Sequence, residues 1–419
     1  MSIQRHDSAK QIRTLLVDNS DSGAFKLRTF PKIGESLPAA ARRVLTAIHP
    51  TLLERIIQDT AGGLHEVCTG NASVWASSRL DETYSITNMY GVGWHLDRGH
   101  FDETLREACD PVLHKGKFLG LRRVDGGFGG GWEIDVEPMV AGGNVARFRA
   151  HWLVDATGRP ATIARKIGAV TRKHHDLLAF YAVLHKVDID SHAASLNGTP
   201  DDNDSRTLIE AAQSGWWYSA RLPHNKRVLM YTTSPSNPST RNARKMFKFF
   251  DMARDQTSHI ARVLVDKSIA LYELPSAEFT RCTAAGSSVL APYAAWEPVL
   301  SSDDYQPSEE VRFQGRGWCA VGDAALAFDS LSSQGMITAL DGGAFVGAVL
   351  VRYLTGGDND PSKTIDGEGV VASICDAYER VRVKYEGGRA YYYSLVRRFD
   401  EAEDTSEGRS GQFWQSQRG

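Results

Sequence analysis

The stretch Gly317–Leu340, GWCAVGDAALAFDSLSSQGMITAL, decides the fold. It begins with a short apolar run that predicts a strand, continues through Gly322-Asp323-Ala324, and opens a long apolar helix at Gly335. Gly322 lets the backbone approach a bulky group, and Asp323 places a carboxylate at the carboxyl end of a strand, where open α/β sheets bind ligands. The first N–H groups of the helix favour an anion. Taken alone, a Gly-Asp pair at a strand end is equally typical of a plain turn.

The whole string resembles the C-terminal flavin motif of FAD-dependent monooxygenases and halogenases with a glutathione-reductase-like fold. In that motif GDAA is followed by a loop and an FAD-contacting helix. The sequence pattern AFDxLSSQGxxxAL resembles the motif of a narrower branch of this family. That branch consists of the flavoproteins related to tryptophan halogenases and to the maturation enzymes of lysine-oxidase-type quinoproteins. The resemblance implies FAD as cofactor and contacts to it from Gly322, Asp323, Ser332, Gln334, Gly335 and Met336.

Two N-terminal segments fit the same family. Arg13–Asp18, RTLLVD, predicts a strand that places Asp18 to accept the hydroxyls of an adenosine ribose. The alternative for Asp18 is a surface acid that ends a buried strand. Lys32–Pro38, KIGESLP, resembles the family's GES segment, which implies that Glu35 and Ser36 lie beside the isoalloxazine or the ribityl chain. Without the resemblance, a Glu-Ser pair before a proline-led helix is ordinary capping chemistry.

Two further motifs extend the resemblance. Gly93–Ala108, GWHLDRGHFDETLREA, matches the family's W-x-x-x-R-x-x-F-D signature, which implies that Arg98 contacts the FAD diphosphate or ribityl region. A guanidinium suits this role because its planar fork binds phosphate at two points, although a helix-flanking surface arginine is the alternative. The string DATGR implies that Asp155 and Gly158 lie under the adenosine side of FAD.

One expected part of such a flavoprotein does not occur at the start of this sequence. A G-x-G-x-x-G turn normally precedes the strand that ends in the ribose acid, and here only Met1–Ile12 precedes RTLLVD, enough for the tail of a first helix. We expect either that about thirty upstream residues carry the missing βα unit, or that the protein lacks the turn. Without it, affinity for the FAD diphosphate would fall and sheet edges would be exposed.

Bulk composition restricts the class of protein. The net charge is −3 with acids and bases interspersed, which indicates no nucleic-acid surface. Five scattered cysteines without CxxC spacing argue against a disulfide framework or a metal site. The longest apolar run, Ala344–Leu354, is too short to span a membrane and contains Arg352, so it predicts a buried helix. With no signal peptide at the start, we expect a cytoplasmic protein.

The pattern along the chain predicts an α/β fold: a Rossmann-like FAD-binding domain, an inserted and mainly antiparallel β-sheet substrate domain, and C-terminal helices. The FAD-binding domain takes residues 1–64, 94–175 and 300–399, with its first βα unit absent. The substrate domain takes residues 65–93 and 176–299 and includes one helix over Asn242–Val263. Gly120–Arg159 predicts a β-meander, and residues 400–419 predict a polar, disordered tail.

The choice between halogenation and oxygenation depends on the residues that are expected to face the flavin. Tryptophan halogenases carry a lysine between the GES and W-x-x-x-R motifs, and no lysine occurs from Glu35 to Arg98. In its place, Cys68–Leu80, CTGNASVWASSRL, resembles a segment of the quinoprotein-maturation flavoproteins, which are thought to oxygenate a tryptophan of a partner oxidase. Trp216 and Tyr218 share one face of a predicted strand and Trp217 takes the other.

We therefore predict an FAD-dependent monooxygenase that transfers oxygen through a flavin hydroperoxide to an aromatic group, with a partner oxidase as one possible source of that group. Trp75, Trp216 and Tyr218 are expected to line the substrate pocket, although core aromatics of an alternating strand are the alternative. No histidine or carboxylate is singled out as a catalytic base. A halogenase, a small-molecule reductase, and an FAD-deficient module that only binds a partner remain open.

Overall fold

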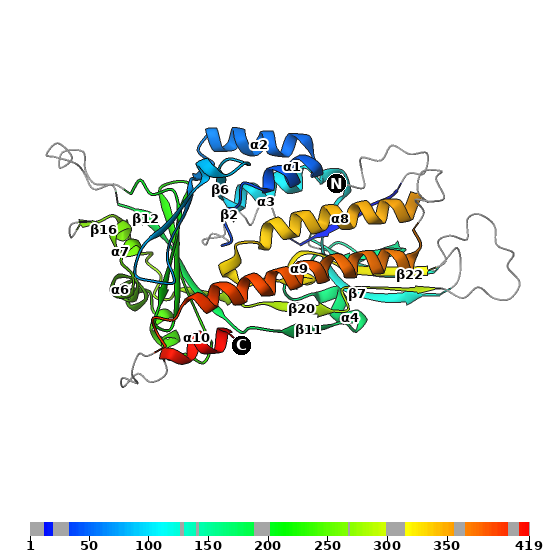
Figure 1. Ribbon diagram of the computed structural model, residues 1–419. Helices are drawn as coiled ribbons and strands as arrows, with labels where there is room; N and C mark the ends of the chain where they lie inside the picture. The colour runs from blue at the N-terminus through cyan, green and yellow to red at the C-terminus, as the bar shows by residue number, and fades with distance from the viewer. Residues whose placement is uncertain are drawn as a thin grey trace, which may run out of the picture.

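The computed structural model describes residues 12–19, 33–125, 130–139, 142–187, 202–266, 269–298, 315–355, 365–400 and 410–418. Residues 1–11, for which the sequence predicts the end of a helix, lie outside this part. The described chain forms two packed halves (Figure 1): one is built on a single large sheet, and the other on smaller sheets covered by long helices.

The large sheet is mainly antiparallel, as predicted for the substrate domain, with the strand order β18-β12-β15-β14-β13-β4-β5 and β19 also paired to β12. Its β4 and β13 run parallel to each other. The strands are β4 (Gly70–Val74), β5 (Asp81–Tyr84), β12 (Leu178–Lys186), β13 (Thr207–Ala212), β14 (Gly215–Leu222), β15 (Lys226–Thr233), β18 (Tyr272–Glu273) and β19 (Arg281–Ala284).

Strand β14 presents different aromatic residues to the two faces of this sheet. Trp216 and Tyr218 pack in one cluster with Trp75, whereas Trp217 packs with Phe249 on the opposite face. The predicted alternation of these side chains is therefore confirmed. The face of Trp217 is covered by α5 (Thr240–Ala243), α6 (Met246–Gln256) and α7 (His259–Leu264).

The prediction of one helix over Asn242–Val263 is wrong, because extended backbone at Lys245 and Thr257 divides the segment into three helices. A two-stranded ribbon, β16 (Val265–Asp266) and β17 (Ile269–Ala270), follows the last of them. Short 3₁₀ turns elsewhere in the chain are η3 (Ser85–Thr87), η4 (Asp110–Val112), η6 (Gly322–Ala324) and η7 (Ser330–Ser332).

The second half contains the parallel strand pairs expected of a Rossmann-like part. The first of its sheets has the order β1 (Leu16–Asp18), β7 (Leu113–Val124), β8 (Gly131–Pro138) and β9 (Ala146–Ala150), with β1 parallel to β7. The second has the order β10 (Trp152–Asp155), β22 (Gly315–Ala320) and β21 (Ala294–Pro298), with β10 parallel to β22. The third consists of β11 (Val170–Lys173), β20 (Ser288–Ala291) and β23 (Leu326–Ala327). The antiparallel run β7-β8-β9 confirms the predicted meander. Helices α4 (Thr162–Ile167), α8 (Gly335–Thr355) and α9 (Gly367–Leu395) contribute to the same core.

A third group of elements covers the N-terminal end of α8 (Figure 1). It consists of α1 (Ala41–Ile48), α2 (Pro50–Ala61) and α3 (Arg98–Glu107) with the small sheet β2 (Ser36–Leu37), β6 (Gly93–Leu96) and β3 (His65–Cys68). Strand pairing differs from the predicted domain limits at two places. Strand β3 pairs with β6, and β20 and β21 pair with strands of the Rossmann-like half.

Helix α8 is the one described helix that is long and apolar enough to cross a membrane. It packs on α1 and α9, and its Val346, Val349 and Leu350 are buried in the core of the Rossmann-like half. This packing agrees with the buried helix predicted for Ala344–Leu354.

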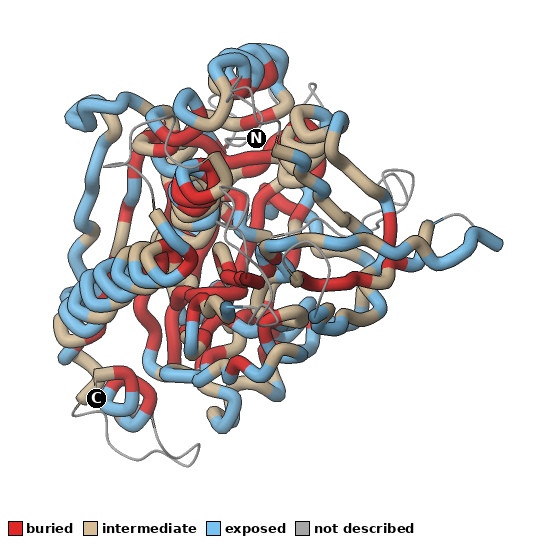
Figure 2. The backbone as a smooth tube through the Cα atoms, turned by 90° about the vertical axis from the view of Figure 1, so that its right-hand side faces the viewer, coloured by how far each residue is buried: buried red, intermediate tan, exposed pale blue. Residues whose placement is uncertain are grey.

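Residues 410–418 correct the prediction of a disordered tail over residues 400–419. They form α10 (Ser410–Arg418), which packs against the end of α9 (Figure 1). Phe413 and Trp414 are buried, and in Figure 2 the buried backbone includes one side of this last helix. The average polarity of the segment concealed these two adjacent aromatic residues, which are enough to dock it.

Candidate functional site

The strand, turn and helix predicted for Gly317–Leu340 are present as β22, η6 and α8. Gly322 has a φ of 56°, and a Cβ there would lie 3.1 Å from Cβ of Ala339 in α8. Glycine is therefore needed twice, for the left-handed turn and for the close approach of the helix. At this joint between strand and helix, the close approach of Gly322 is to helix α8, and the predicted approach to a bulky ligand stays a prediction.

Asp323 lies in this turn, next to Arg159 and within the electrostatic influence of Arg98. Oδ2 of Asp323 is 3.5 Å from Nε of Arg159. Burial raises the pKa of Asp323, and the positive charges of Arg159 and Arg98 partly oppose this shift. Arg159 is held in place because its guanidinium donates to the carbonyl oxygens of Gly286 at 2.7 Å and Phe328 at 2.9 Å.

The loop before α8 leaves hydrogen-bond donors at the start of that helix. Ser332 Oγ donates to the carbonyl of Asp329 at 2.8 Å, and Ser333 has a left-handed φ of 49°. The N–H groups of Gly335 to Ile337 have no partner within the helix, and no hydrogen bond from the rest of the described chain satisfies them. A Cβ added to Gly335 would lie 3.8 Å from Oδ1 of Asp323, so the start of the helix is close to this carboxylate. These donors suit an anionic or strongly polar group.

The GES segment lies against strand β14 of the large sheet. Glu35 is only 4% exposed, and its carboxylate accepts the N–H of Gly34 at 3.0 Å and the hydroxyl of Tyr218. Ser36 Oγ is 2.7 Å from the same hydroxyl. Burial and the Glu35 carboxylate raise the pKa of Tyr218 well above its usual value, so its hydroxyl stays protonated.

Arg98 holds the same segment from the other side. Its Nη1 donates to the carbonyls of Gly34 at 2.7 Å and Ile33 at 3.2 Å, while Nε and Nη2 bind the carboxylate of Asp102. Gly34 has a φ of 88°, and a Cβ there would lie 3.1 Å from Nη1 of Arg98. In this structure Arg98 braces the turn before Glu35, and its predicted contact with FAD stays a prediction.

The three residues predicted to line a substrate pocket lie together, in a packed aromatic cluster. Trp75 contacts Trp216, Tyr393 and Trp414 edge-on at centroid distances of 5.4–6.4 Å. Trp216 is fully buried, and its Nε1 donates to the hydroxyl of Tyr393 at 3.2 Å. Trp75 Nε1 donates to a backbone carbonyl of α9 at 2.7 Å. Their role in a substrate pocket stays a prediction, since their polar atoms are bonded within the chain.

Asp18, Asp155 and Gly158 lie at the ends of the parallel strands. Asp18 accepts a hydrogen bond from Arg106 Nε at 2.8 Å. Asp155 is fully buried and accepts the N–H groups of Thr157 at 2.9 Å and Ala164 at 2.8 Å, so it caps α4. Gly158 has a φ of 74° and therefore turns the chain after β10. A contact of any of the three with FAD stays a prediction.

Sequence reasoning missed a second buried acid, Asp329, within the same motif. Its carboxylate accepts the N–H of Leu331 at 2.9 Å, the hydroxyl of Tyr393 at 2.8 Å and Nε of Arg389 at 3.2 Å. Arg389 in turn binds the backbone and side chain of Gln417 in α10. The one signal in the sequence was an acid inside an otherwise apolar and serine-rich motif, and nothing in it indicated partners on α9 and α10.

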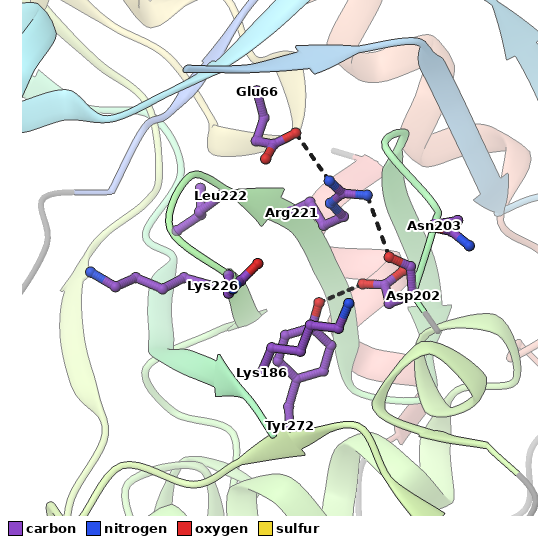
Figure 3. Close-up of a pocket in the computed structure, with 9 residues that line it drawn as sticks. Glu66, Lys186, Asp202, Asn203, Arg221, Leu222, Lys226 and Tyr272 are labelled. Atoms are coloured by element: carbon purple, nitrogen blue, oxygen red, sulfur yellow. Dashed lines mark hydrogen bonds and ion pairs between the residues drawn. The ribbon is translucent and has the colours of Figure 1, made fainter. Parts of the chain in front are cut away.

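The cavity in Figure 3 lies in the large-sheet half and has a volume of about 110 Å³. Asp202 at its wall accepts hydrogen bonds from Tyr272 at 2.6 Å and from the buried Arg227 at 2.7 Å. Arg221 joins Glu66 to the backbone carbonyl of Asp202. These groups are paired with one another and the volume is well below that of a typical cofactor site, so we assign the cavity a structural role. Among the described residues, no cluster of three or more His, Cys, Asp or Glu could hold a metal ion.

Comparison with known proteins places this geometry in context. No protein-family model matches the chain. Over 272 residues the chain is 25% identical to LodB of Marinomonas mediterranea, a curated relative named as an FAD-dependent oxidoreductase. The alignment covers 64% of this chain and 61% of LodB, so the chain spans less than two thirds of that relative.

Three solved structures illustrate the likeness in fold. CmlS, a flavin-dependent halogenase, has a TM-score of 0.68 at 16% identity, over 97% of this chain and 63% of that one. The flavin-dependent brominase Bmp2 has a TM-score of 0.67 at 15% identity, over 96% and 86%. QhpG, a peptidyl tryptophan dihydroxylase essential for tryptophylquinone cofactor biogenesis, has a TM-score of 0.57 at 15% identity, over 97% and 78%. The two-part architecture and these likenesses show that the chain has the fold of the flavin-dependent halogenases CmlS and Bmp2.

Proposed function

We propose that this protein is an FAD-dependent oxidoreductase of the monooxygenase type, which adds oxygen to a tryptophan of a partner protein. The observation that carries the proposal is that Arg98, which braces the GES turn through the carbonyl of Gly34, is near enough to Asp323 of the C-terminal motif to lower its pKa against the effect of burial. The likenesses to LodB and QhpG support the same chemistry.

The residues present fit a flavin. The unsatisfied N–H groups at the start of α8 would face its anionic pyrimidine edge, and Asp323 would accept a hydroxyl of the ribityl chain. Arg159 would keep Asp323 charged and in place. Asp18 at the end of β1 would accept the adenosine ribose once it shares or releases Arg106.

When bound and reduced, the flavin activates dioxygen and so supplies the reactive oxygen. The residues of this chain would bind and orient the flavin and exclude water from it. Phe328 and Trp318 bury the floor of the joint. The hydroxyl of Tyr218 keeps its proton and donates a hydrogen bond to Glu35, so this carboxylate stays fixed and dry beside the GES turn. No general base is required of the chain, because the oxygen itself is the electrophile.

Oxygenation is favoured over halogenation by the residues in the region between the GES turn and α3. No lysine occurs from Glu35 to Arg98 to carry an activated halogen. The tryptophan substrate follows from QhpG, which acts on a peptidyl tryptophan, and from the motif at Trp75. Because biogenesis of a quinone cofactor acts on a newly made partner, we place the reaction in the cytoplasm.

The first test is whether the purified chain binds FAD. Its visible spectrum is recorded after desalting, and FAD is then titrated back by fluorescence. We expect flavin absorbance and saturable binding. A protein that stays colourless and does not bind added FAD would instead support a module that only binds a partner.

The second test concerns the product. A candidate oxidase, chosen from the genes that neighbour this one, is co-expressed with and without this protein, and its tryptophan peptides are analysed by mass spectrometry. We expect one tryptophan to gain one or more oxygen atoms. A chlorinated or brominated tryptophan would assign the protein to the halogenases, and an unmodified oxidase with flavin bound would indicate a small-molecule reductase.

A further inference from the structure

Hydrogen bonds link strand β14 to both of the motif segments that the proposed function assigns to the cofactor, directly to the GES turn and through Tyr393 of α9 to the loop before α8. The first link runs from Tyr218, whose hydroxyl donates to Glu35 and lies 2.7 Å from Ser36 Oγ. Glu35 and Tyr218 are 183 positions apart in the chain. Glu35 and Tyr218 are buried, and Ser36 is partly buried.

The second link runs from Trp216 through α9. Trp216 Nε1 donates to the hydroxyl of Tyr393 at 3.2 Å, and that hydroxyl donates to Oδ2 of Asp329 at 2.8 Å. Asp329 is the first residue of the loop before α8. Its carboxylate caps the 3₁₀ turn η7 of that loop by accepting the N–H of Leu331. Trp216, Tyr393 and Asp329 are each fully buried.

Both links begin on the same buried strand, β14. Trp216 and Tyr218 are two residues apart on the same face of β14, which sets their Cα atoms about 7 Å apart. The strand lies between β13 and β15 and is buried along almost its whole length. Such a strand positions a site more precisely than loops can do alone.

The loop before α8 is also held from its other side. Arg389 binds Asp329 and reaches Gln417 of α10. Tyr393 stacks beneath the Arg389 guanidinium, 4.3 Å from the ring centre. Asp329 therefore connects the large sheet, α9 and α10 to the start of α8.

We propose that Tyr218, Trp216 and Tyr393 are positioning residues, through which β14 sets the GES turn and the loop before α8 at a fixed separation on either side of the flavin. The proposal rests on the proposed function for the identity of the group between the two segments. It gives Trp216 and Tyr218 a role different from stacking on a substrate.

The chain offers closely matched variants for a test. Tyr218→Phe and Tyr393→Phe each remove one hydroxyl, and Tyr231→Phe removes the hydroxyl of another fully buried tyrosine, which bonds Ser239 on the far face of the sheet. The control for Trp216→Phe is Trp217→Phe, because the indole of Trp217 donates to Gln256 on that far face.

Amide hydrogen exchange is measured without FAD, with the melting temperature of each variant. We expect Tyr218→Phe to speed exchange at least fivefold in residues 33–37 but not in 329–337, and Tyr393→Phe and Trp216→Phe to do the reverse. Tyr231→Phe and Trp217→Phe should leave both segments unchanged even where they lower the melting temperature.

FAD titration of the same variants completes the test. We expect each of the three positioning variants to raise the Kd for FAD at least fivefold over its matched control. If exchange in both segments follows the controls, the proposal is wrong. If the variants show the expected exchange pattern but the wild-type protein binds no FAD, the hydrogen-bonded links stand and the proposed function fails.

Discussion

Several acidic residues that the motifs assign to a cofactor are bound by the protein itself. Asp155 caps α4, Glu35 accepts Tyr218, and Asp18 accepts Arg106. A buried carboxylate without such donors would be costly, because charge taken out of water must be paired or hydrogen-bonded. Asp323, which burial and two arginines influence in opposite directions, is the most open of the motif acids to an external partner.

Arg98 is expected to matter for flavin binding through the turn that it braces. Arg98→Ala removes donors to the carbonyls of Ile33 and Gly34 and leaves Asp102 without its main cation. The loss should weaken FAD binding by about 1.5–3 kcal/mol, the range for a charged hydrogen bond, which fluorescence titration would measure as a Kd raised roughly tenfold to a hundredfold. Arg43→Ala, at an exposed arginine, is the control and should bind FAD like the wild type.

His95 makes stability depend on pH in a predictable direction. It is fully buried, its Nε2 lies 3.0 Å from Thr207 Oγ1, and burial with the nearby Arg227 lowers its pKa to about 3. The unfolded chain therefore takes up this proton near pH 6.5 while the folded chain does not until about pH 3. Stability falls as the pH decreases through that window.

The expected contribution is about 1–2 kcal/mol between roughly pH 7 and pH 5. Urea unfolding of His95→Gln should show a weaker loss of stability over this range than the wild type. The exposed His185→Gln is the control and should keep the wild-type slope. Equal slopes for wild type and His95→Gln would show that His95 does not resist protonation in the folded state.

Among the elements, α10 shows how little apolar sequence is needed to dock a helix. Trp414 is fully buried between Trp75, Tyr393, Phe399 and Phe413, and its Nε1 donates to the carbonyl of Ala212 at 3.0 Å. One side of the helix is thus anchored in the same aromatic cluster as Trp216.

Truncating Trp414 should therefore lower stability strongly. Trp414→Ala leaves a cavity and an unpaired carbonyl, and we expect a loss of about 3–5 kcal/mol of unfolding free energy. The exposed Gln415→Ala on the same helix should change it by less than about 0.5 kcal/mol. Similar urea midpoints for the two variants would mean that α10 is not docked in solution.

For the whole molecule, the two halves are joined by hydrogen bonds as well as by apolar packing. Strand β14 of the large sheet reaches Glu35 on one side and, through Tyr393, Asp329 on the other. Arg398 adds a third link, since its guanidinium donates to the carbonyls of Val74, Ser77 and Ala211. The flavin proposed at the joint would thus lie between parts that are already held together.

The whole molecule should oxygenate and not halogenate. With flavin, reductant and an excess of chloride or bromide, we expect products that carry added oxygen only, because no lysine lies between Glu35 and Arg98. Mass spectrometry of the substrate distinguishes the two products by mass and by isotope pattern.

The amino-acid sequence by itself determined the local features: the strand, turn and helix at Gly322, the meander of β7 to β9, and the two faces of β14. Each depends on residues that are close in the chain, whose periodicity and turn chemistry act within one element. The same local view failed at Lys245 and Thr257, where extended backbone interrupts a helical pattern. It also failed for α10, whose two aromatic residues need a distant cluster to be buried.

Only the tertiary structure decided which distant residues meet. Tyr218 and Glu35, Trp216 and Tyr393, and Asp329 and Arg389 are joined across 60 to 183 positions by the packing of whole elements. No pattern within a strand or helix encodes such a pair, because its geometry follows from how the large sheet, α9 and α10 pack together. For that reason Trp216 and Tyr218 could be placed on one face of a strand from the sequence, while the buried acids to which that face is linked could not.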